Sequence, residues 1–285
     1  VYGNIFIACG RSHSYEIKEV MIDKLIEGKV DLEKSDDYRI DVYDGVDNTS
    51  MYLGYPGINA FHSVVPASIF EFYDYIGVER SVGSRPDTDQ AAIRPLLSVK
   101  YLLNRKDEDA KKFLDENNET KMPNYEYLKT DGGYYVYENK NYIPFGFSYN
   151  YYMSYAFCDE YSKSSRAAMM LKAILLTDEQ IEKYKDILDN IENLEMPPFG
   201  GDETGTTLSQ TDSAMEYDCE QLRETAAYSF KRDNTGFTAD VTRDKENLVF
   251  FSVPYDEGWS ATVNGEPAEI EKVNAGFMAV KVGAG

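Results

Sequence analysis

The sequence predicts an α+β protein in which a mixed α/β domain is followed by an antiparallel β-sandwich. Residues 248–282 hold four short apolar runs separated by turn residues, which is typical of antiparallel strands. Residues 1–196 instead mix helical and strand patterns. The polar Pro/Gly/Thr-rich residues 197–213 separate the two regions, so we predict a domain at 1–196, a linker at 197–213 and a β-sandwich at 214–285.

The C-terminal region has the most regular pattern. Residues 248–253 form an apolar, β-branched and aromatic run, and Pro254 ends the strand because it has no N–H to donate. Trp259 opens a second alternating strand at 259–263. Asn264-Gly265, which tolerates positive φ at both positions, indicates a tight hairpin. Two more strands follow at 266–273 and 277–282, with a turn between them.

The N-terminal region alternates strand-like and helix-like segments. Apolar residues at helical spacing, Gly and Pro punctuation and a capping box at Thr177 indicate the helices. We predict strands at 1–9, 38–43, 125–128 and 133–138, a buried strand with a helical lead-in over 94–103, and helices at 17–25, 66–76, 106–118, 165–176 and from 178 onward. Residues 149–161 have an ambiguous period. Residues 215–223, 226–231 and 236–241 indicate strands that lead into the sandwich.

Charge and hydropathy exclude several classes of function. The chain has 29 Lys and Arg against 50 Asp and Glu, a net charge of −21, so it would repel a phosphate backbone and no nucleic-acid partner is expected. It has no run of 18 apolar residues, hence no predicted membrane span, and no recognisable signal peptide at its start. We expect a piece of a longer protein, flanked by membrane helices and with its last strand truncated after Gly285.

The cysteines and histidines do not suggest a metal or redox site. Cys9, Cys158 and Cys219 are too few and too scattered for a disulfide framework, and buried thiols are favoured over a single bridge. His13 and His62 do not stand at zinc-ligand spacing from them. No metal or other cofactor is predicted.

The acidic residues do not indicate a catalytic pair. Glycoside hydrolysis needs two carboxylates that face one bond, and 50 acidic residues make neighbouring pairs in sequence inevitable. Asp87-Thr88-Asp89 could bind a divalent cation, but it stands in a polar loop after Pro86. There is also no Gly-x-Ser-x-Gly elbow and no phosphate-binding loop. We therefore assign no catalytic residue, and leave open whether the longer parent is an enzyme.

Aromatic and basic side chains supply the candidate ligand contacts. Tyr255 and Trp259 could stack on sugar rings. We expect Trp259 to be a buried core anchor, since it stands in an alternating strand, and Tyr255 to be the better contact. Arg94 and Lys100, with Arg105, could form a basic patch that binds an anionic group.

Four motifs in a fixed order resemble those of a known family. The last contains Pro254-Tyr255, Gly258-Trp259, Asn264-Gly265 and Gly276-Phe277-Met278. It is preceded by the segments 57–63, 96–101 and 134–147, which read GINAFHS, LLSVKY and YYVYENKNYIPFGF. Together they resemble the C-terminal extracytoplasmic segment of YfhO-like bacterial membrane proteins, which are multispanning and have a GT-C type glycosyltransferase architecture.

The resemblance implies a location and a function. It places the chain on the extracytoplasmic face of the bacterial membrane, with the membrane-embedded remainder of the same protein as a partner. Family members are implicated in glycosylating cell-envelope polymers such as teichoic and lipoteichoic acids, with polyprenyl-linked sugars as donors. Their catalytic carboxylate lies in an early loop that these residues do not include. The chain would thus be non-catalytic, and would cap the membrane domain or bind the acceptor glycan. A cell-surface carbohydrate-binding or adhesion module is the alternative.

Overall fold

The computed structural model describes residues 29–43, 48–62, 64–79, 83, 86, 90–105, 120, 124–194 and 212–285. The elements predicted for 1–9, 17–25 and 106–118 lie outside the described residues, as do Cys9, His13, the Asp87-Thr88-Asp89 motif and most of the predicted linker.

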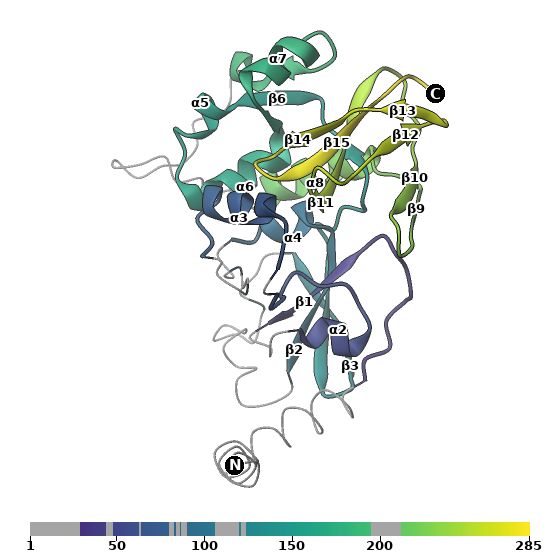
Figure 1. The fold of residues 1–285 in the computed structure, drawn as a ribbon. Helices are drawn as coiled ribbons and strands as arrows, with labels where there is room; N and C mark the ends of the chain where they lie inside the picture. Colours follow the sequence, from purple (N-terminus) through teal and green to yellow (C-terminus); the bar gives the residue numbers. More distant parts are fainter. Residues whose placement is uncertain are drawn as a thin grey trace, which may run out of the picture.

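A four-stranded mixed sheet forms the lower part of the molecule in Figure 1. Its order is β1 (Arg39–Tyr43), β2 (Val99–Arg105), β4 (Tyr134–Asn139) and β3 (Tyr125–Asp131). β1 runs parallel to β2 and the other pairs are antiparallel. The β3–β4 hairpin turns at Gly132 and Gly133, both at positive φ, which confirms the predicted paired strands. The short helix α2 (Thr49–Leu53) packs beside β1.

Helices occupy the middle and upper parts of the molecule. These are α3 (Ala67–Tyr75), α4 (Ile93–Leu96), α5 (Tyr155–Cys158), α6 (Lys163–Lys172) and α7 (Asp178–Tyr184). Thr177 caps α7 through the predicted capping box, in which its side chain accepts from the Gln180 N–H. A small parallel sheet of order β7-β6-β8 lies beside them, made of β6 (Tyr151–Ser154), β7 (Ile174–Leu176) and β8 (Asp189–Asn190), and is followed by the 3-10 helix Ile191–Asn193.

The helix predicted for 165–176 ends earlier than expected. α6 stops at Lys172, and Ala173 is extended. Residues 174–176 then form β7, which pairs with β6 and is buried along its whole length. A short apolar run cannot be assigned to helix or strand by periodicity alone, and here the parallel partner strand decides it.

The C-terminal strands confirm most of the predicted pattern. A four-stranded sheet has the order β14 (Ile270–Val273), β15 (Phe277–Val282), β11 (Asn247–Pro254) and β5 (Phe147–Ser148). Two separate hairpins accompany it: β9 (Ser229–Arg232) with β10 (Phe237–Asp240), and β12 (Ala261–Val263) with β13 (Glu266–Ala268). Asn264 and Gly265, at φ 53° and 86°, make the predicted tight turn.

The strand predicted for 215–223 is wrong. These residues belong to the helix α8 (Asp212–Glu224), which packs against α6. Met215, Cys219 and Leu222 are its buried residues, and their spacing of four and three places them on one helical face. A strand would place Met215, Tyr217 and Cys219 on one face, but Tyr217 is 62% exposed.

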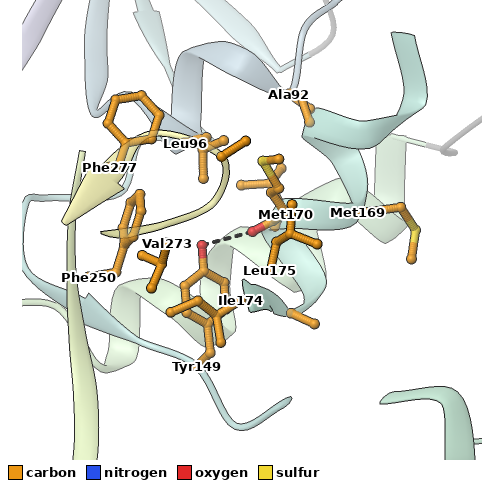
Figure 2. Close-up of a cluster of buried hydrophobic side chains, with 14 of the residues drawn as sticks. Ala92, Leu96, Tyr149, Met169, Met170, Ile174, Leu175, Phe250, Val273 and Phe277 are labelled. Atoms are coloured by element: carbon orange, nitrogen blue, oxygen red, sulfur yellow. Dashed lines mark hydrogen bonds between the residues drawn. The ribbon is translucent and has the colours of Figure 1, made fainter. Parts of the chain in front are cut away.

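The main core draws on residues from both sides of the predicted linker. In Figure 2, Phe250, Val273 and Phe277 of the C-terminal strands face Leu96 of α4 and Ile174 of β7. The Tyr149 hydroxyl donates to the Met170 carbonyl at 2.8 Å within the same cluster. The α+β class is confirmed. The packing of two sheets into a C-terminal sandwich, and the division into domains, stay predictions.

Candidate functional site

A pocket of about 300 Å³ opens beside the β9–β10 hairpin. The residues around it come from five separate parts of the chain: the approach to β1, the loop before Gly57, the segment before β5, the hairpin itself, and the segment from β11 to β12. They are Asp36, Arg39, Pro56, Phe145, Phe230, Arg232, Asp233, Asn234, Thr235, Gly236, Phe237, Val253 and Trp259. Four aromatic rings, two arginines and two carboxylates are therefore gathered at one site.

The aromatic rings form a continuous row. Phe145 stacks on Phe230 with ring centroids 4.7 Å apart, and Phe230 stacks on Phe237 at 5.2 Å. Phe237 then contacts Trp259, at 5.8 Å and an interplanar angle of 60°. It also packs against Phe251 of β11, at 4.9 Å. The row ties the hairpin to the main sheet and leaves the partly buried Trp259 at its end, beside the pocket.

Arg39 forms one wall of the pocket. Its guanidinium lies 4.5 Å from the centroid of the Phe145 ring. It donates to the Leu97 carbonyl at 2.8 Å, and to the hydroxyl and carbonyl oxygens of Ser252 at 2.9 and 2.8 Å. Burial lowers the pKa of Arg39 to about 10, so the side chain remains charged at neutral pH. The two bonds to Ser252 hold β1 to β11, and the third holds β1 to the end of α4.

The pocket is also lined by a second cation and two carboxylates. Arg232 Nε donates to Asp36 at 3.0 Å, and both side chains are well exposed. In the hairpin turn, Asp233 Oδ1 accepts from the Thr235 N–H, the Thr235 hydroxyl and the Gly236 N–H. The hydrogen bonds from the Thr235 side chain and from these backbone groups hold the pKa of Asp233 below its usual value. The turn is therefore ordered around an ionised carboxylate.

Trp259 differs from its expected position, and Tyr255 does not line the pocket. Trp259 is partly buried at the pocket and is not a core residue, so the expectation of a core anchor is wrong. The reason is local: the Trp259 and Gly258 N–H groups bond to Asp256, forming a turn, and the strand begins only at Ala261. Tyr255 has its backbone bonded to Ser68 and Gly276 and does not line the pocket. A ligand contact at Tyr255 stays a prediction.

Arg94 lies in the interior and away from the pocket. It is 2% exposed, and its Nε lies 3.0 Å from Asp41 Oδ2. It also donates to the carbonyls of Pro86 and Gln90, at 2.7 and 3.3 Å. Asn59 donates to the other oxygen of Asp41 at 2.7 Å. This buried network joins β1 to α4 and to the predicted family motif at 57–63, which gives Arg94 a structural role.

Lys100 is enclosed by aromatic rings. Its Nζ lies 5.2 to 5.7 Å from the ring centroids of Tyr38, Tyr101 and Tyr142, and 3.4 Å from Glu33. Burial alone would lower the pKa of Lys100, but Tyr101 and Glu33 outweigh it and raise the pKa above its ordinary value. The ammonium group thus has partners within the protein, and neither Lys100 nor Arg94 lies at the pocket.

The sequence did not single out most of the pocket. Arg39, Phe145, Phe230, Arg232 and Phe237 are far apart in the chain, and no motif spacing links them. The one local signal was Asp233-Asn234-Thr235-Gly236, a group of turn residues between two strand-like segments. It predicts a hairpin and says nothing about what the hairpin faces.

Metal-ligating and thiol side chains in the described part of the chain do not form a second site. Among the described residues, no group of three His, Cys, Asp or Glu side chains could hold a metal ion. Cys158 and Cys219 are free and fully buried, and burial raises the pKa of the Cys158 thiol to about 11 and that of Cys219 further. Both thiols are therefore protonated and unreactive at neutral pH.

Comparison with known proteins identifies the family to which the chain belongs. Within the part of the chain that the structure describes, no helix is long and apolar enough to cross a membrane. A search of curated proteins found no match. No solved structure matches either. Residues 12–199 and 202–285 match the family model described as "Bacterial membrane protein YfhO". Because this match covers nearly the whole chain, the chain belongs to the YfhO family of bacterial membrane proteins.

Proposed function

We propose that this chain is the extracytoplasmic part of a multispanning GT-C type glycosyltransferase that modifies a cell-envelope polymer of the teichoic acid type. The donor is a polyprenyl-phosphate-linked sugar, and catalysis belongs to the membrane-embedded remainder of the protein. The part described here caps that remainder and binds the acceptor glycan. Membership of a bacterial membrane protein family supports the setting.

The pocket at Trp259 carries the proposal. Sugar rings present C–H groups on one face and hydroxyls at the edge, so a protein binds them with an aromatic surface bordered by polar groups. Trp259 and Phe237 supply the aromatic surface, and Arg232, Asp233 and Asn234 supply polar groups around it. The hairpin that holds most of these residues is fixed by the row of stacked rings.

The charge of the chain limits how an anionic polymer could approach. The net charge of −21 repels a polyphosphate chain over most of the surface. Arg39 and Arg232 make the pocket less negative than this average. An anionic polymer would therefore bind at the pocket and be repelled by the remaining surface.

The direct test is a chromosomal Trp259→Ala substitution in the bacterium that produces the protein. We expect fewer sugar substituents per phosphate on the purified envelope polymer, measured by NMR, at an unchanged protein level. Tyr217→Ala is the matched control, because Tyr217 is also an aromatic residue, is 62% exposed and lies on α8 away from the pocket. Full sugar content in the Trp259→Ala strain would contradict the proposal.

The alternative function, a carbohydrate-binding or adhesion module, would use the same pocket. It predicts a different outcome for a strain that lacks the gene. Such a strain would keep its polymer-bound sugar and lose adhesion to glycan-coated surfaces. A strain that loses the sugar substituents supports the transferase.

A further inference from the structure

The charged groups of the pocket balance one another. Arg39 and Arg232 stand against Asp36 and Asp233, so the four charged side chains sum to zero. Arg232 is already paired with Asp36 at 3.0 Å. A site that binds phosphate usually presents excess positive charge. This pocket presents none.

Arg39 is held by the protein itself. Both of its terminal nitrogens donate to Leu97 or Ser252, and Phe145 covers one face of the guanidinium. Bidentate binding of a phosphate needs two parallel N–H groups, one on each terminal nitrogen. In Arg39 both terminal nitrogens already donate to Ser252. Arg39 therefore acts as a wall of the pocket and braces the two strands.

The hydrogen-bonding capacity that remains suits hydroxyl groups. Asp233 Oδ1 holds the turn, while Oδ2 has no hydrogen-bond partner among the described residues. The terminal nitrogens of Arg232 have none either, since only its Nε and backbone N–H are bonded. A free carboxylate oxygen beside free guanidinium donors accepts from one hydroxyl and donates to its neighbour. Trp259 and Phe237 provide an apolar surface beside this pair.

We propose that the pocket binds one or two uncharged sugar rings and does not bind the phosphodiester backbone of the polymer. This rests on the proposed function and deepens it by naming the ligand class. The volume of about 300 Å³ is at the small end of ligand sites, which fits one or two rings. The chain would hold the envelope polymer by its sugar substituents, with the phosphates directed to solvent.

The test uses the fluorescence of Trp259, the only Trp in the chain, excited selectively at the red edge of its absorption band. The 285-residue chain is titrated with a panel of methyl pyranosides, and separately with glycerol 3-phosphate and inorganic phosphate. We expect at least one glycoside to give a saturable change, with a dissociation constant of about 1 mM or weaker, and the phosphates to give none. A response to the phosphates alone, or to none of the ligands, would overturn the inference.

Asp233→Asn separates the two ligand classes by the sign of its effect. Asn keeps the Oδ1 acceptor that holds the turn, and loses the free carboxylate oxygen and its charge. Sugar binding should weaken about three- to tenfold, whereas phosphate binding would tighten because the pocket becomes net positive. Asp131→Asn is the matched control, since the Asp131 carboxylate also accepts a backbone N–H, that of Asp31 at 2.9 Å, and does not line the pocket.

A third measurement distinguishes failure of this inference from failure of the proposed function. The chain is immobilised, and purified polymer is applied with and without its sugar substituents. Binding of the sugar-bearing form alone supports both proposals. Equal binding of the two forms contradicts the inference and leaves acceptor binding intact. Binding of neither form contradicts both.

Discussion

Gly276, which directly precedes strand β15, lies close against helix α3. A Cβ atom at this position would clash with the Ser68 carbonyl oxygen and lie 3.2 Å from Phe72 Cβ. Tyr255 holds Gly276 and helix α3 together through two hydrogen bonds. Its N–H donates to the Gly276 carbonyl at 2.9 Å, and its carbonyl accepts from the Ser68 hydroxyl at 2.7 Å. The family motif Gly-Phe-Met therefore begins with a glycine for a steric reason.

We expect Gly276→Ala to lower the free energy of unfolding by about 1–3 kcal/mol, the usual cost of overpacking an interior. Backbone atoms, rather than the flexible end of a side chain, would have to move. Gly283→Ala is the control, because a Cβ there meets nothing within 4 Å and its φ is unrestricted. Chemical denaturation of both variants tests this, and equal stability of the two would contradict the contact.

Replacing Arg94 should destabilise the protein more than replacing an exposed cation. Arg94→Met leaves Asp41, itself 1% exposed, as a buried carboxylate without its cation. The expected loss is about 3–5 kcal/mol of unfolding free energy. Lys281→Met removes the exposed pair with Glu246 and should cost under about 1 kcal/mol. Urea denaturation compares them, and equal losses in the two variants would contradict a stabilising role for the buried pair.

Glu271 joins two elements, helix α7 and strand β14. Gln180, Lys183 and Tyr184 on α7 all bond its carboxylate, at 2.8, 2.5 and 2.5 Å. Burial raises the pKa of Glu271, but the hydrogen bonds from Lys183, Tyr184 and Gln180 outweigh it and lower the pKa below its ordinary value of 4.5. The ionised side chain is therefore the form that stabilises this contact.

The pH dependence follows from the sign of that shift. A lowered pKa in the folded state gives stability that is present above pH 4.5 and is lost as pH falls through the folded pKa. We expect Glu271→Gln to cost about 1–3 kcal/mol at pH 7, and the difference from the wild type to shrink on acidification. Denaturation curves at several pH values measure it, with exposed Glu269→Gln as control. A difference that grows toward low pH would contradict the assignment.

Elements defined by local chemistry were predictable from the sequence. The turn at Asn264-Gly265 and the cap at Thr177 depend on residues within a few positions of each other, and both are confirmed. Helix α8 and strand β7 were missed, because the choice between helix and strand depended on α6 and β6, which pack against them. The pocket was missed for the same reason: Arg39, Phe145 and Trp259 meet only through tertiary contacts.

At the scale of the whole molecule, the structure links the two predicted domains closely. Strand β5 precedes the predicted linker and pairs with β11, which follows it. Helix α8 packs against α6 across the same division, and Arg39 of β1 donates to Ser252 of β11. The main hydrophobic cluster includes residues from both regions. Such shared burial favours one cooperative unit.

We therefore expect a single unfolding transition for both regions. Trp259 fluorescence reports on the C-terminal region, and labelling of the fully buried Cys158 thiol, in a Cys9→Ser, Cys219→Ser background, reports on the N-terminal one. Coincident midpoints in denaturant are the expected result. Two separate transitions would show instead that 1–196 and 214–285 are independent domains.

The pocket at Trp259 is proposed to contact envelope glycan, and the indole N–H signal of Trp259 reports on that contact. A ¹⁵N-labelled chain has one indole cross-peak, because it has one Trp. Adding purified sugar-bearing polymer should shift or broaden this peak, and Asp233→Asn should reduce the change at equal polymer concentration. Polymer binding that leaves the indole peak unmoved would contradict the account.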